Sequence, residues 1–167
     1  MKLEVLYEDN HLLIINKPAG VLVQGDITGD LPLVELAKAY IKQKHKKPGA
    51  VFLGVIHRLD RPTSGAIVFA RTSKALKRLN LQFKDRMTKK IYWAITKASP
   101  SPSSNTLIHW TVRNTKQNKS YVYQKEVPES KKAILKYSEK KKLNNYSLLE
   151  IELETGRHHQ IRSQLSA

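Results

Sequence analysis

The sequence predicts an α+β protein whose sheet is mixed and largely antiparallel. Two observations predict this class. Short apolar or alternating runs of strand length recur along the chain, and two segments in its first half repeat apolar residues at helical spacing. The second half is dominated by strand-like runs. With 167 residues and no cysteine, the chain is long enough to bury a hydrophobic core without disulfides.

In the first half, strands and helices are expected to alternate. The predicted strands are residues 3–7, 11–16 with a short continuation over 21–23, 51–56 and 66–70. Residues 24–30 look like a loop. The predicted helix over 33–44 places Leu33, Leu36, Ala37, Tyr40 and Ile41 on one face, and Ser73 is positioned to cap a second helix that ends near Lys84.

The second half is expected to be mainly strand, with predicted segments over 89–97, 107–112, 121–125, 133–137 and 146–154. Residues 99–104 look like a Pro/Ser linker, and 107–112 with 121–125 like a mobile basic hairpin. Thr155 is positioned to cap a final helix. On the strand over 89–97, Tyr92 shares a face with Lys90 and Ala94, whereas Trp93 is expected in the core.

The charge balance favours a polyanionic partner. Thirty Lys and Arg residues face fourteen Asp and Glu residues, which gives a net charge of +16. Such a field attracts nucleic acid, although a basic, solubility-driven surface is the structural alternative. No apolar stretch approaches the ~20 residues that span a bilayer, and no signal-peptide core follows Met1. We therefore expect a cytoplasmic protein that does not enter a membrane.

The first segment that could carry chemistry is His57-Arg58-Leu59-Asp60-Arg61-Pro62-Thr63-Ser64-Gly65. It places polar and charged side chains between two apolar strands, and its proline and glycine restrict the backbone path. A loop held between core strands is a rigid platform for polar groups. The alternative is a connecting turn in which Asp60 caps backbone N–H groups.

The second segment is Thr155-Gly156-Arg157-His158-His159-Gln160-Ile161-Arg162. On a helix, His158 and Arg162 share a face. The two adjacent histidines diverge and have no third ligand at metal spacing, so no metal site is expected. The alternative is a basic helix start, which opposes the helix dipole and would need an anion or a buried carboxylate beside it.

Three segments, in order and with matching gaps, resemble the RluA family of RNA pseudouridine synthases: Asn16-Lys17-Pro18-Ala19-Gly20, the segment with Asp60, and Gly156 to Arg162. Lys90-x-Tyr92 matches between the second and third. The resemblance covers essentially the whole chain, and it implies a sheet with a central RNA-binding cleft. The family pattern continues beyond Arg162, so we expect residues 1–167 to be a catalytic domain truncated at its C-terminus. No auxiliary RNA-binding domain is expected before it.

The resemblance also implies roles for single residues. Asp60 matches the catalytic aspartate, Tyr92 the tyrosine that stacks on the target base, and Arg162 the basic residue that pairs with the aspartate. Arg58 matches the arginine that fills the gap left by the flipped base. Other polar residues of the matched segments are expected to contact RNA: Lys17, His57, Arg61, Lys90, Arg157, His159 and Gln160.

The implied reaction converts specific uridines of rRNA or tRNA to pseudouridine, by a monomer without a cofactor or metal. The target base must leave its stack to be reached, and a carboxylate must stay ionised while partly buried. A non-catalytic RNA-binding or chaperone role is the main alternative. A nuclease is disfavoured, because no carboxylate cluster for two metal ions is apparent.

Overall fold

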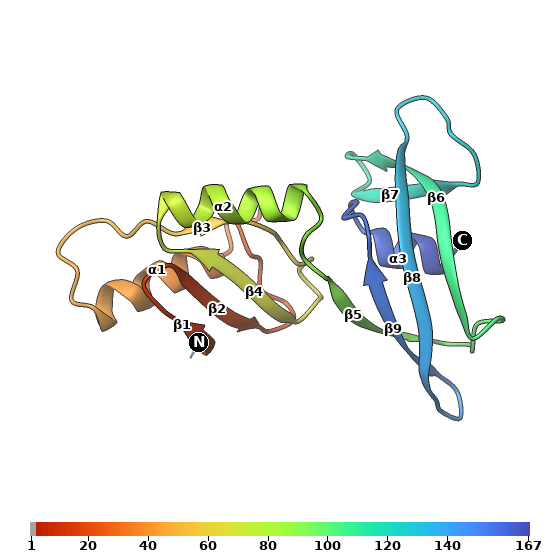
Figure 1. The fold of residues 1–167 in the computed structure, drawn as a ribbon, viewed down its shortest axis with the longest axis horizontal. Helices are drawn as coiled ribbons and strands as arrows, with labels where there is room; N and C mark the ends of the chain where they lie inside the picture. Colours follow the sequence, from red (N-terminus) through yellow and green to blue (C-terminus); the bar gives the residue numbers. More distant parts are fainter. Residues whose placement is uncertain (1–2) are drawn as a thin grey trace. The chain divides into compact units, whose positions relative to one another are not determined.

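The computed structural model of the protein describes residues 3–167 and contains two compact units, Met1–Met87 and Thr88–Ala167 (Figure 1). Each unit is built on its own sheet, and all strand pairings among the described residues are antiparallel. The predicted α+β class with a largely antiparallel arrangement is confirmed.

The first unit contains a four-stranded sheet in the order β1-β2-β4-β3 and two helices. The elements are β1 (Glu4–Glu8), β2 (Leu12–Lys17), α1 (Leu33–Lys44), β3 (Gly54–Val55), β4 (Gly65–Ala70) and α2 (Ser73–Lys84). Alternate residues of β2 and β4 are fully buried and meet one face of α1 in a single core, which includes Leu13, Ile15, Ile67, Phe69, Leu33, Ala37 and Ile41. The predicted bounds of α1 and the predicted end of α2 near Lys84 are confirmed.

The prediction of a short strand over Val21–Val23 is wrong, because the backbone carbonyls of this segment bind the first N–H groups of α1 and not another strand. The carbonyl of Leu22 accepts from Leu33 N–H at 2.7 Å, and that of Val23 accepts from Val34 N–H at 3.2 Å. These N–H groups begin α1 and would otherwise lack partners, since Pro32 at the N-cap offers no side-chain bond. The segment therefore caps a helix, while Val23 fills the core.

The strand predicted over 51–56 is reduced to Gly54 and Val55, which pair with Ala70 and Phe69. Close packing favours glycine at position 54, because a Cβ there would come within 2.8 Å of the Leu76 side chain in α2. Helix α2 is capped by Thr72 and not by Ser73 as predicted. The Thr72 hydroxyl accepts from Ala75 N–H at 3.1 Å.

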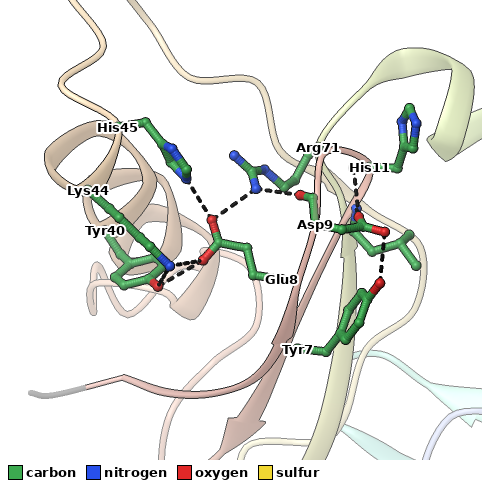
Figure 2. A network of polar contacts seen from close by, with 9 residues as sticks. Tyr7, Glu8, Asp9, His11, Tyr40, Lys44, His45 and Arg71 are labelled. Carbon is green, nitrogen blue, oxygen red and sulfur yellow. Dashed lines mark hydrogen bonds and ion pairs between the residues drawn. The ribbon is translucent and has the colours of Figure 1, made fainter.

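A cluster around Glu8 joins β1, the end of α1 and the residue after β4 (Figure 2). The Glu8 carboxylate, 8% exposed, accepts from Tyr40, Lys44, His45 and Arg71 at 2.7–2.9 Å. Burial would raise the pKa of Glu8, but the bonds from Lys44, His45 and Tyr40 outweigh it and lower that pKa to about 2.

The second unit contains a five-stranded sheet in the order β5-β9-β8-β6-β7 and one short helix. The elements are β5 (Ile91–Thr96), β6 (Ser104–Asn114), β7 (Lys119–Tyr123), β8 (Lys131–Lys142), β9 (Ser147–Leu153) and α3 (Gln160–Leu165). The predicted pairings of 107–112 with 121–125 and of 133–137 with 146–154 are confirmed. The predicted Pro/Ser linker is a loop within this unit, between β5 and β6.

Two expectations for the second unit are wrong. Trp93 is 70% exposed and not in the core, because the apolar cluster lies on the opposite face of β5, where Tyr92 and Ala94 pack. Thr155 does not cap α3, which begins at Gln160 after His159. Instead its buried hydroxyl accepts from Ile134 N–H at 2.8 Å and contacts Gln160 Oε1 at 2.8 Å.

Candidate active site

Asp60 lies half-buried in the loop between β3 and β4, at the start of a tight turn. Its backbone carbonyl accepts from Thr63 N–H at 3.0 Å. Leu59 packs against the core of the first unit, and Gly65 begins β4 with φ +132°, a value that favours glycine. The backbone is therefore fixed on both sides of Asp60.

Lys17 ends β2 with a completely buried side chain. Its Nζ donates to the carbonyls of Pro18, Val21 and Arg61 at 3.1, 2.8 and 3.2 Å, which uses all three ammonium donors. Burial lowers the pKa of Lys17, and the charge of Asp60 acts in the opposite direction. The Asp60 carboxylate therefore lies within electrostatic reach of this ammonium. A direct contact of Lys17 with RNA would require exposing a side chain that the fold buries.

Arg61 connects the loop to the Asn16–Gly20 segment. Its carbonyl accepts from Gly20 N–H at 2.8 Å, and its Nε donates to the Gly20 carbonyl at 3.0 Å. The guanidinium also pairs with Asp30 at 2.7 Å, with both side chains about half exposed. Two of the sequence segments singled out above thus meet in the first unit, through Lys17 and Arg61.

His57 supports the loop from the side of β4. Strand β3 ends at Val55, and the His57 Nε2 accepts the next N–H of β4, that of Val68, at 3.0 Å. Because a backbone N–H can only donate, Nε2 carries no proton in this arrangement. The ring also stacks on Phe83 of α2, with centroids 5.1 Å apart. The next residue, Arg58, is exposed to solvent.

Tyr92 is half-buried in β5 of the second unit, opposite Ile151 of β9. It packs against the apolar cluster of that sheet, as do Ile161 and Leu165 of α3. Tyr92 and α3 therefore share one face of the sheet. Lys90, just before β5, is half-buried, and its carbonyl accepts from Leu153 N–H at 3.0 Å.

Gln160 is buried at the start of α3 and holds the preceding segment in place. Its Oε1 accepts from the Thr155 hydroxyl and from Arg157 N–H, both at 2.8 Å, while its Nε2 donates to the Ile134 carbonyl at 3.1 Å. The Nε of Arg157 donates to the Lys132 carbonyl at 2.9 Å. Gln160, expected to contact RNA, lies where its side chain ties α3 to β8.

The two histidines of this segment stack on each other, with ring centroids 3.6 Å apart. His158 contacts the Ser120 hydroxyl of β7 at 2.9 Å, and His159 takes a left-handed backbone conformation with φ +51°. Arg162 follows on α3 and is exposed. In the part of the chain that the structure describes, no group of three His, Cys, Asp or Glu residues could hold a metal ion.

The structure thus gathers Lys17, His57, Asp60 and Arg61 in the first unit. Tyr92, Arg157, His159, Gln160 and Arg162 lie in the second. The sequence reasoning missed the supporting roles of Asp30 and Ser120 and gave Thr155 a different one. Asp30 pairs with Arg61, Ser120 contacts His158, and Thr155 accepts from Ile134 N–H. These partners are distant in sequence, so no local pattern marks the contacts. Among residues 3–167, the structure contains no helix that is long and apolar enough to cross a membrane.

Comparison with known proteins assigns the chain to a family. The sequence model of the RNA pseudouridylate synthase family matches residues 11–167. An uncharacterized RNA pseudouridine synthase of Synechocystis is 35% identical over 96% of this chain and 49% of its own length. Ribosomal large subunit pseudouridine synthase D of Zymomonas mobilis is 34% identical over 99% of this chain and 52% of its own length. The chain therefore spans about half the length of these relatives.

The fold agrees with this assignment. The structure of human RNA pseudouridylate synthase domain containing 4 matches 98% of this chain and 63% of its own chain, with a TM-score of 0.82 and 27% sequence identity. The family match covers nearly the whole sequence, and the similar proteins include ribosomal large subunit synthases of types C and D. The chain belongs to the RluA family of RNA pseudouridine synthases.

Proposed function

We propose that this protein isomerises specific uridines of RNA to pseudouridine, with Asp60 as the nucleophile. The observation that carries the proposal is the setting of Asp60. It is half-buried in a loop whose neighbours are tied to the core, and it lies within electrostatic reach of the buried Lys17 ammonium. A fixed carboxylate suits a step in which positive charge develops on the ribose, because it can attack or stabilise the developing charge at C1′.

The reaction balances without an external reagent. The bond between N1 of the uracil and C1′ of the ribose breaks, the base rotates, and C5 bonds to C1′. The proton on C5 is lost and N1 gains one, so nothing is oxidised or reduced. An ionised Asp60 serves both routes that we consider, direct attack on C1′ and assistance to glycal formation.

The other site residues divide the remaining tasks. We assign Tyr92, half-buried beside an apolar cluster, to stacking on the detached base and to the removal of its C5 proton. We assign Arg162, exposed on α3, to the basic catalytic role that the family resemblance implies, and Arg58, exposed in the same loop as Asp60, to filling the stack that the flipped base leaves. Arg61, Lys90, Arg157 and His159 assist RNA binding. Lys17, His57 and Gln160 act as positioning residues, because each is engaged by the backbone of its own unit.

The substrate class that we propose is ribosomal or transfer RNA. The net charge of +16 favours a polyanion, and several of the similar proteins are named as ribosomal large subunit synthases. We also propose that the protein acts as a monomer in the cytoplasm. A mass from light scattering that equals twice the chain mass would contradict the monomer.

The test is release of tritium from RNA labelled at C5 of uridine. In the full-length protein, Asp60→Asn should lower release by roughly a thousandfold or more while RNA affinity stays within a few-fold. Asp85→Asn is the matched control, because Asp85 is an exposed residue at the end of α2. It should release tritium at the wild-type rate.

Equal release by wild type and Asp60→Asn would refute the nucleophile assignment. RNA binding by the wild type with no release from any cellular RNA would favour the non-catalytic alternative. Pseudouridine mapping of cellular RNA with and without the gene identifies the modified uridine.

A further inference from the structure

The sheet of the second unit has a face that the site above does not use. On β6, the buried His109 and Thr111 lie toward α3, where His109 contacts Gln164 at 3.0 Å. Side chains alternate along a strand, so Ile108 and Trp110 lie on the opposite face. Ile108 is 47% exposed and Trp110 is half-buried there.

Aromatic side chains gather on this opposite face at the β6–β7 edge. Trp110 lies directly across from Tyr123 of β7, and Tyr121 lies across from Val112. Tyr121 and Tyr123 are 44% and 40% exposed. On its other side Trp110 pairs with Lys132 of β8, whose ammonium lies 5.8 Å from the ring centroid. We call Trp110, Tyr121 and Tyr123 the aromatic platform.

The surroundings of the platform are basic. Residues 113–132 contain six Lys and Arg residues against two Glu residues. At the far edge of the same face, Trp93 lies across from Glu150, and Ile91 lies across from Glu152. Lysines neutralise both carboxylates there, since Lys140 pairs with Glu150 and Lys89 with Glu152, each at 3.3 Å. The protein therefore presents its two tryptophans on one sheet face, with an excess of cations around Trp110 and paired charges around Trp93.

We propose that the aromatic platform binds unpaired bases of the substrate RNA by stacking, while Lys119 and Lys132 contact the phosphates. The inference rests on the proposed function, because it takes RNA as the substrate. Flat aromatic side chains on an open sheet stack bases of any sequence, and flanking lysines hold the backbone. The platform would thus bind a single-stranded segment on the sheet face opposite Tyr92 and α3, without reading its sequence.

The two tryptophans make a direct test, because the chain has no others. In Trp93→Phe all tryptophan fluorescence comes from Trp110, and in Trp110→Phe it all comes from Trp93. The full-length variants are titrated with an oligoadenylate of about eight nucleotides, a length within the usual site size. We expect saturable quenching in Trp93→Phe and none in Trp110→Phe. A duplex RNA of equal length should quench little, because its bases are paired inside a helix and their faces cannot reach the platform.

A second set of variants measures affinity. Tyr123→Ala should bind the oligoadenylate roughly tenfold more weakly, whereas Tyr123→Phe and Trp93→Ala should bind like the wild type. Any of three results would overturn the proposal that the aromatic platform binds RNA. These are absence of quenching in Trp93→Phe, equal quenching by the duplex, and wild-type affinity of Tyr123→Ala. Since the probe contains no uridine, these outcomes are independent of tritium release, which tests the proposed function separately.

Discussion

Each unit holds its functional segment with one buried polar side chain, but the two side chains differ in charge. Lys17 of the first unit binds three carbonyls beside the Asp60 loop. Gln160 of the second unit binds a hydroxyl, an N–H and a carbonyl before α3. An amide both accepts and donates, so it can connect mixed partners, whereas an ammonium only donates.

The difference shows what each segment requires. A buried ammonium costs more to desolvate than a buried amide, and carbonyl dipoles offset that cost at Lys17. In return its charge lies within reach of Asp60, which a neutral amide would not supply. The segment before α3 needs only a defined path. We therefore infer that Lys17 both holds its segment in place and supplies a charge, whereas Gln160 only holds its segment in place.

The largest effect on stability is expected for Lys17→Met, which removes the donor from three carbonyls. The free energy of unfolding of the first unit should fall by about 3 kcal/mol, because buried acceptors without partners are costly. Helices α1 and α2 belong to this unit and both tryptophans to the other. Circular dichroism in urea should therefore measure the loss of stability in the first unit. The control Lys38→Met, on the surface of α1, should change the stability little. An unchanged urea midpoint for Lys17→Met would contradict this stabilising role of Lys17.

Gln160→Leu should have the next largest effect, about 2 kcal/mol in the second unit, since three polar groups lose a neutral partner. Tryptophan fluorescence measures this unfolding transition. Gln82→Leu, an exposed substitution on α2, is the control. If Gln160→Leu lowered tritium release as much as Lys17→Met without changing stability, the purely mechanical assignment of Gln160 would be wrong.

Acid should lower the free energy of unfolding of the first unit through Glu8. The folded pKa of Glu8 is about 2, below its ordinary 4.5. Its contribution is therefore complete above pH 4.5 and is lost as the pH falls toward 2. Solvent screens the half-exposed Lys44 and His45, so we expect a loss of about 1–2 kcal/mol in the first unit. Urea titrations at neutral and acid pH measure it. Glu8→Gln should remove most of the difference, and an equal acid loss in that variant would exclude Glu8 as its source.

The smallest effect is expected at the exposed ion pair between Asp30 and Arg61. Asp30→Asn breaks the ion pair with Arg61, in which both side chains are about half exposed. Such pairs contribute little in water, so stability should change by less than about 0.5 kcal/mol. A loss in urea titrations as large as that of Lys17→Met would show that the loop depends on its surface pair.

The sequence determined much of the secondary structure of this protein. Helical spacing predicted the bounds of α1 and the position of α2 apart from its N-cap, and the strand pairs of the second unit were predicted from alternation and turns. Local periodicity suffices there, because each element buries one continuous face. The order and spacing of the three segments was also sufficient to indicate the family.

Tertiary structure alone decided which polar residues of those segments support the fold. Lys17 and Gln160 look like surface residues in the sequence, yet both are buried by partners up to 44 positions away. Trp93 looks like a core residue and is exposed, because the face of β5 that is buried depends on where the cluster of β8, β9 and α3 lies. Val21–Val23 caps α1 through backbone groups that no side-chain pattern encodes. Hydrogen bonds and burial are set by neighbours in space, whereas sequence patterns record neighbours along the chain.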